Sequence, residues 1–124
     1  MHIKGIALNS GMLYTSGRGF VSLVYRKELY KKRCRDKGFM KYTDPEAHEI
    51  ISKLPPVLLS SARGDFLRSH TLKFARTLKA NGAKPLLIYY PDRKDLTHAF
   101  VSLRPSLPES RKALTKIYRW IKSR

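Results

Sequence analysis

The chain has 124 residues, of which 42% are hydrophobic, and 26 Lys or Arg against 9 Asp or Glu. This length and hydrophobic content fit one folded domain and exclude a wholly disordered chain. The formal net charge of +17 raises the expectation of an anionic partner, although a solvated basic surface would give the same charge. The single cysteine, Cys34, excludes an internal disulfide framework and fits a reducing compartment, so we expect a cytoplasmic protein.

The N-terminal stretch MHIKGIALNSGML is apolar only over a short run that polar residues interrupt, unlike a signal peptide. Within it, IKGIAL at 3–8 predicts a short buried strand, and the following NSG predicts a turn. No run approaches the roughly 18 apolar residues of a membrane-spanning helix, so none is expected.

Residues 9–56 form an irregular excursion with scattered glycines and a basic stretch, YRKELYKKRCRDKGFMKY. We expect one or two helices here, around 20–35 and 45–52, with loops between them. Pro55 and Pro56 mark the end of the region, because proline cannot continue a helix.

A strand, a helix and a second strand follow in 57–90. VLLS at 57–60 and PLLIYY at 85–90 are continuous apolar runs, which indicates strands buried on both faces, as in a parallel sheet. Between them, SHTLKFARTLKA has apolar residues at helical spacing, and Asn81-Gly82 gives the expected stop. The segment is therefore predicted to be a right-handed βαβ unit.

The last helix is marked by a possible capping box, Ser106 with Glu109, and by Pro108 in its first turn. Its predicted apolar stripe is Ala113, Leu114, Ile117, Trp120 and Ile121. The fold class is thus α/β, with about three mostly parallel strands and flanking helices. A parallel sheet this small leaves edges and faces uncovered, so we expect the 124 residues to be one partial domain of a larger sheet.

Two loops that follow strands carry residues suited to catalysis. SARGDFL contains Asp65, and PDRKDLTHAF contains His98. The carboxyl ends of parallel strands meet at one edge, where ligands and catalytic groups gather, so the two side chains could meet there as an acid–histidine pair. From the residues alone, Asp65 is more simply interpreted as a helix N-terminal residue, and the alternative for His98 is an ordinary loop histidine. Asp92 and Asp95 are rival acids, more simply read as solvated loop charges.

The order of these motifs resembles the C-terminal part of α/β-hydrolase-fold esterases of the hormone-sensitive-lipase-like group. The matching features are Leu54-Pro55-Pro56, the apolar strand, Asp65-Phe66-Leu67-Arg68, the helix up to Gly82, and His98-Ala99-Phe100. PESRKALTKIYRWI is similar to the last helix of that family, and IKGIALNSG to the preceding strand. Residues 9–56 fall where the family carries cap-side material, and 57–124 where it carries the acid and histidine loops.

The resemblance implies that Asp65 is the acid and His98 the general base of a serine carboxylesterase or lipase, with no metal or organic cofactor. Three departures accompany it. Phe66 and Ser69 replace residues that are often proline and an acid, Ala99 replaces a glycine, and the nucleophile motif G-x-S-x-G and the oxyanion loop HGGG are absent. We therefore expect the chain to be inactive alone, as a segment of a truncated, split or incomplete enzyme that needs an N-terminal half carrying the serine and then acts on esters.

Two other functions stay open. The basic stretch at 25–42 interleaves cations with Tyr30 and Phe39, which would suit a small nucleic-acid- or anion-binding protein, although a solvated helix explains it more simply. The chain could also be a non-catalytic hydrolase remnant.

The remaining candidates are weaker. His48-Glu49 begins a zinc motif that Ser52 does not complete, and no other histidine or cysteine has metal-ligand spacing. Ser10 and Ser16 are nucleophiles only by default. His70 is expected at the surface of its helix.

Overall fold

The protein is described here by a computed structural model that covers residues 3–17, 19–47 and 49–124. Three parallel strands form one sheet in the order β1-β2-β3: β1 (Ile6–Asn9), β2 (Val57–Ala62) and β3 (Leu86–Tyr90). Ile6 pairs with Val57 at the start of the sheet, and Ala62 pairs with Tyr90 at its end. The predicted parallel α/β sheet is confirmed.

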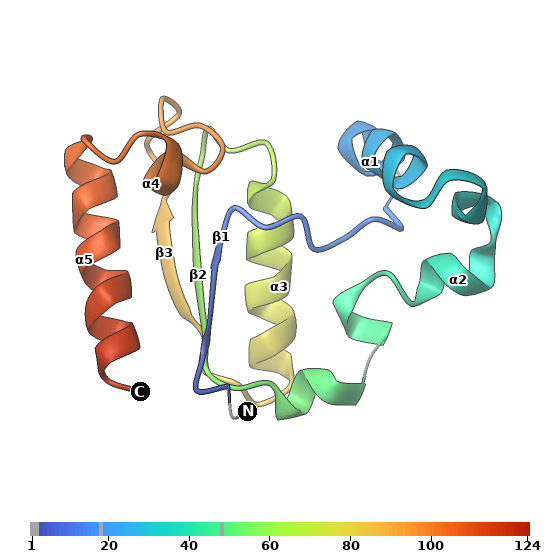
Figure 1. Cartoon of the computed structure of the whole chain (residues 1–124), viewed down its shortest axis with the longest axis horizontal. Helices are drawn as coiled ribbons and strands as arrows, with labels where there is room; N and C mark the ends of the chain where they lie inside the picture. The colour runs from blue at the N-terminus through green and yellow to red at the C-terminus, as the bar shows by residue number, and fades with distance from the viewer. Residues whose placement is uncertain (1–2, 18, 48) are drawn as a thin grey trace.

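Helices cover both faces of this sheet. Helix α3 (Arg68–Ala80) packs on one face, and α4 (Phe100–Leu103) and α5 (Pro108–Lys122) lie on the other (Figure 1). Because successive side chains of β2 point to opposite faces, Val57 and Leu59 join the core beneath α3, whereas Leu58 joins the core beneath α4 and α5. The result is a three-layer arrangement with two apolar cores.

Only the middle strand is buried on both faces. All six residues of β2 are buried, but β1 is half-buried and Ala7 is exposed. In β3 only Ile88 is buried, and Leu86 is exposed. The predicted burial of the first and last strands was therefore wrong, because both lie at edges of the sheet.

The helix ends follow local backbone chemistry. Helix α3 stops at Ala80, and Gly82 adopts a positive φ of 80°, as the Asn81-Gly82 pair predicts. Helix α5 begins at Pro108 with Leu107 as its N-cap, and no side chain caps it among the described residues. The proposed capping box of Ser106 and Glu109 was therefore wrong: Ser106 lies one residue too early.

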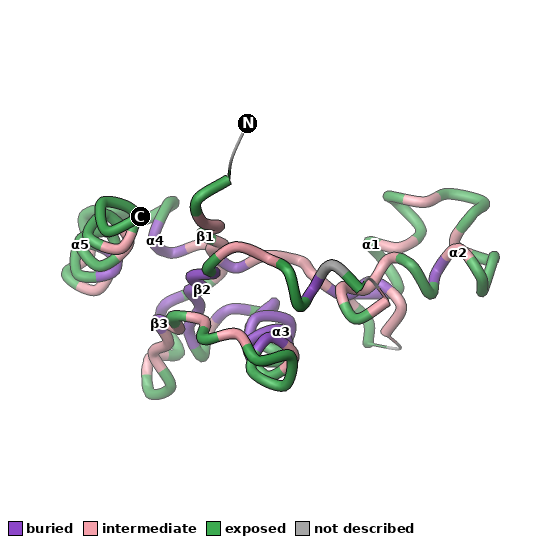
Figure 2. The backbone as a smooth tube through the Cα atoms, turned by 90° about the horizontal axis from the view of Figure 1, so that it is seen from below, coloured by how far each residue is buried: buried purple, intermediate pink, exposed green. Residues whose placement is uncertain are grey.

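The excursion between β1 and β2 forms an arm that extends away from the sheet (Figure 1). It contains α1 (Phe20–Tyr30) and α2 (Lys37–Lys41), with 3₁₀ turns at Lys31–Arg35, Pro45–Ala47 and Glu49–Lys53. The helix expected around 45–52 is thus 3₁₀ rather than α. Buried residues gather around β2 and α3, whereas most residues of α1 and α2 are exposed (Figure 2). None of the described helices is long and apolar enough to cross a membrane.

Candidate active site

The loops after β2 and β3 lie directly against each other at the carboxyl edge of the sheet. The Arg63 amide donates to the Tyr90 carbonyl oxygen, at 3.1 Å, where the strands end. Beyond this point Gly64 lies so close to the other loop that a Cβ there would be 2.0 Å from the Lys94 carbonyl oxygen and 2.7 Å from that of Leu96. A residue without a side chain is therefore required where the two loops touch.

This contact brings Asp65 and His98 together. His98 Nδ1 lies 3.0 Å from Asp65 Oδ1, although the two residues are 33 positions apart in the sequence. The Asp65 side chain is fully buried, whereas the His98 side chain is 35% exposed. The Leu67 amide donates to the same Oδ1 at 2.9 Å, and the Ser61 hydroxyl donates to Oδ2 at 2.7 Å. Both carboxylate oxygens are therefore hydrogen-bonded, and the imidazole beside them stays partly exposed.

Hydrogen bonds keep the buried Asp65 carboxylate ionised. Burial by itself would raise its pKa, but the side chains of Ser61 and Ser10, the Leu67 amide and His98 all donate to it and hold the pKa below its usual value. A carboxylate in contact with Nδ1 selects the tautomer of His98 that carries its proton on Nδ1. In that tautomer Nε2 carries no proton, and its lone pair can accept one.

The backbone around His98 is sharply turned. Ala99 has a φ of 52°, in the left-handed region, and α4 begins at the next residue, Phe100. The ring of Phe66 lies 4.6 Å from that of His98, centroid to centroid. Phe66 also borders a pocket of about 350 Å³ between the arm and α3. His98 thus lies between the buried Asp65 carboxylate and the ring of Phe66.

The rival acids do not take this position. Asp95 pairs with Arg93 through two contacts of 2.8 and 2.7 Å, and this bond lowers the Asp95 pKa to about 2. Arg93 also pairs with Glu109 at the start of α5. Asp92 is exposed in the same loop. Of the three candidate acids, the structure brings Asp65 to His98.

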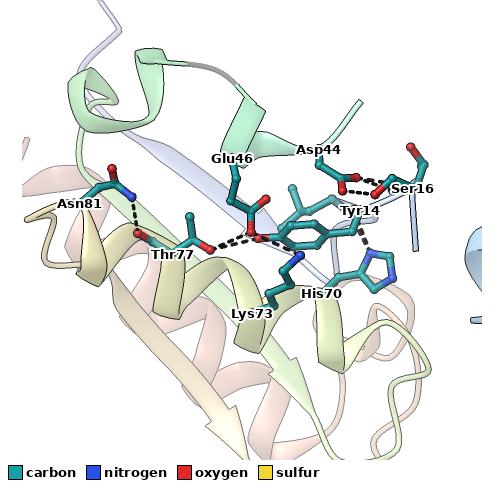
Figure 3. Close-up of polar contacts among 10 residues, drawn as sticks. Tyr14, Ser16, Asp44, Glu46, His70, Lys73, Thr77 and Asn81 are labelled. Carbon is teal, nitrogen blue, oxygen red and sulfur yellow. Dashed lines mark hydrogen bonds and ion pairs between the residues drawn. The ribbon is translucent and has the colours of Figure 1, made fainter. Parts of the chain in front are cut away.

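A second polar cluster lies on the arm side of α3 (Figure 3). The Lys73 ammonium lies 3.4 Å from Glu46 Oε1 and 3.9 Å from the centre of the Tyr14 ring. The Thr77 hydroxyl donates to the same Glu46 oxygen at 2.9 Å and lies 3.4 Å from the Tyr14 hydroxyl. Burial and the neighbouring Glu46 raise the pKa of Tyr14, so its hydroxyl stays protonated. These contacts fasten the arm to α3.

His70 belongs to this cluster, and its expected surface position was wrong. Its side chain is buried, and Nδ1 accepts from the amides of Leu13 and Tyr14 at 3.2 and 3.1 Å (Figure 3). Burial and the positive charge of Lys73 lower the His70 pKa, against the opposing effect of Asp44. A neutral His70 therefore clamps the chain after β1 onto α3. The spacing of 70, 74 and 78 could have revealed this, because residues four apart share a helix face.

Neither default serine is free to act as a nucleophile. Ser16 donates to Asp44, and the buried Ser10 accepts from the Ala99 amide at 3.1 Å. His48, with which the incomplete zinc motif begins, lies outside the described residues, as does His2. In the described part of the chain, no three His, Cys, Asp or Glu residues cluster as metal ligands.

Comparison with solved structures identifies the fold. Esterase B from Lactobacillus rhamnosis, inhibited by a tributyrin phosphonate, matches 97% of this chain with a TM-score of 0.78 at 17% identity. The Pyrobaculum calidifontis esterase matches 98% of it in its monoclinic form, with a TM-score of 0.68 at 25% identity. In another structure, the hyperthermophilic esterase from the same archaeon matches 68% of it, with a TM-score of 0.56 at 33% identity. No protein-family model and no curated protein matches the chain.

The match covers only part of each esterase. This chain spans 39% of the Lactobacillus enzyme and 43% of the monoclinic Pyrobaculum enzyme. The sheet, the flanking helices and the two facing loops are therefore those of one part of an esterase-like α/β-hydrolase fold.

Proposed function

We propose that the chain supplies the acid and the general base of a serine carboxylesterase or lipase of the hormone-sensitive-lipase-like group. In this proposal His98 is the general base, and Asp65 orients it. The observation that carries the proposal is the 3.0 Å contact between His98 Nδ1 and the buried Asp65 carboxylate, in a fold similar to that of known esterases.

The chemistry follows from the tautomer of His98. Its free Nε2 takes the proton from a serine hydroxyl as that oxygen attacks the ester carbonyl, and the Asp65 carboxylate stabilises the imidazolium that forms. Nε2 then returns the proton to the departing alcohol. No metal or organic cofactor takes part in these steps. The pocket bordered by Phe66, of about 350 Å³, would receive an apolar part of the ester.

The nucleophile and the oxyanion donors would come from residues beyond these 124. Among the described residues β1 pairs only with β2, so its outer edge offers backbone groups to another parallel strand. In the matched esterases about three-fifths of the chain lies outside the match. We propose that an N-terminal half carrying the serine extends the sheet at this edge.

The test uses the native protein from the cells that make it, captured with an antibody against α5. A fluorophosphonate probe, which reacts with activated serines, should label either a chain much longer than 124 residues or a companion chain. Replacing His98 with Ala in the gene should abolish that labelling, whereas replacing the exposed Arg76 on α3 should not. Labelling that survives in His98→Ala, or none in the native protein, would refute the proposed function.

A further inference from the structure

The end of β1 contacts the histidine loop at two adjacent residues. The Ser10 hydroxyl accepts from the Ala99 amide at 3.1 Å, and the Asn9 side-chain amide donates to the Ser102 hydroxyl at 3.0 Å. These contacts join positions 89 and 93 residues apart in sequence. The two contacted residues, Ala99 and Ser102, lie on either side of Phe100, the first residue of α4, and Ala99 directly follows His98.

Both members of this pair are themselves fixed. Ser60, which is fully buried in β2, donates its hydroxyl to Asn9 Oδ1 at 2.9 Å, so the Asn9 amide is oriented with its nitrogen toward Ser102. The Ser10 amide donates to the Ser60 carbonyl oxygen at 2.9 Å. The end of β1 is therefore anchored to the central strand before it reaches the histidine loop.

Ser10 adopts an unusual backbone conformation to make its contact. Its φ is 53°, a region in which residues with a side chain are uncommon and costly, and its side chain is almost fully buried. Ala99, its partner, has a φ of 52°. Two such residues facing each other next to His98 indicate that the surrounding contacts impose this geometry.

Ser10 also reaches the acid. Its side chain is one of the hydrogen-bond donors that lower the pKa of Asp65. A hydroxyl has one proton to donate and lone pairs to accept with, so Ser10 can give its proton to the carboxylate and accept the Ala99 amide at the same time. One side chain thus holds the loop of the histidine and also lowers the pKa of the acid.

We propose that Ser10, with Asn9 beside it, is a positioning residue that fixes the direction of the His98 ring relative to Asp65. It holds the chain immediately after the histidine, whereas Ser61 and the Leu67 amide hold the acid alone. This inference rests on the proposed function, because a fixed imidazole matters for catalysis only if His98 is the base.

The experiment compares Ser10→Gly and Ser10→Ala with Ser61→Ala in the full chain. Ser10→Gly removes the hydroxyl and also relieves the positive φ, so it should fold even where Ser10→Ala does not. Ser61→Ala is the matched control, since it also removes a hydroxyl from Asp65 but leaves Ala99 untouched. NMR gives two readouts: the hydrogen-exchange rate of the Ala99 amide and the low-field proton signal of His98 Nδ1–H.

In both Ser10 variants we expect the Ala99 amide to exchange about tenfold faster, since a hydrogen bond is lost. The His98 Nδ1–H signal should broaden or disappear. In Ser61→Ala the Ala99 amide should stay protected. Unchanged Ala99 exchange and an unchanged His98 signal in Ser10→Gly would overturn the inference, and so would equal effects of Ser61→Ala.

The two proposals fail separately. If the wild-type chain shows no Nδ1–H signal, the acid–histidine pair and with it the proposed function fail. The Ala99 exchange rates still decide whether Ser10 holds the loop.

Discussion

Gly64 offers the sharpest test of how the two loops are held together. An alanine there would place its Cβ 2.0 Å from one backbone oxygen and 2.7 Å from another, at Lys94 and Leu96. No side-chain rotation relieves a clash with backbone atoms, so the loops must separate by roughly 1.4 Å before the 2.0 Å contact reaches ordinary van der Waals distance. Overpacking of this kind costs about 1–3 kcal/mol, and we expect the upper end of that range.

The same movement should break the acid–histidine contact. Leu96 precedes His98 by two residues, and the present Nδ1–Oδ1 distance of 3.0 Å is an ordinary hydrogen-bond length that a separation of roughly 1 Å or more would break. Urea unfolding should show a midpoint lowered by roughly 1 M or more for Gly64→Ala, taking a slope of about 2 kcal/mol per M. The His98 Nδ1–H proton signal should disappear with it.

Gly11→Ala is the matched control for this experiment. A Cβ at Gly11 would meet only the Leu13 side chain, at 3.7 Å and beyond, which is ordinary contact. This variant should unfold within about 0.5 kcal/mol of the wild type. If Gly64→Ala were equally stable and kept the His98 signal, the close approach of the two loops would not be what joins the acid to the histidine.

Three further predictions concern buried polar groups. His70→Ala should lower the free energy of unfolding by about 1–3 kcal/mol, because the Leu13 and Tyr14 amides lose their acceptor; urea unfolding measures this, with exposed Arg76→Ala as the control. Because burial lowers the pKa of His70 in the folded protein, the unfolded chain takes up a proton at higher pH than the folded one. The free energy of unfolding should therefore fall as the pH drops below about 6.5, and this fall should be smaller in His70→Ala. In the proposed esterase Asp65→Asn should reduce kcat on the order of 10⁴-fold, and an unchanged kcat would show that Asp65 is not its acid.

The parts of the fold that depend on local sequence could be predicted. The apolar run of β2 and the helical spacing of α3 lie within single stretches, and both elements appear where the patterns place them. The meeting of Asp65 and His98 was also predictable, because parallel strands bring their carboxyl ends to one edge. The prediction needed only the strand order and the two loops.

The incorrect predictions concern properties that depend on which elements lie next to a segment in the fold. Whether an apolar strand is buried on both faces depends on its place in the sheet, so the runs at 3–8 and 85–90 did not reveal that β1 and β3 are edges. At α5, Pro108 in the first helical position was a better signal than the Ser106 and Glu109 pair, because it makes Leu107 the N-cap. The positioning contacts of Ser10 could not be predicted from the local sequence, since they are to residues about 50 and 90 positions away.

The position of Ser10 links the outer edge of β1 to the proposed chemistry. It directly follows β1, the strand whose outer edge would receive the half that carries the serine nucleophile. A parallel strand added there would fix β1 from its other side. The hydrogen bonds of Asn9 and Ser10 would then hold the loop of His98 in place relative to β1. The distance between nucleophile and base would then be set through backbone pairing and two side-chain contacts. A sheet edge that assembles the two parts of the protein would in this way also align the catalytic groups.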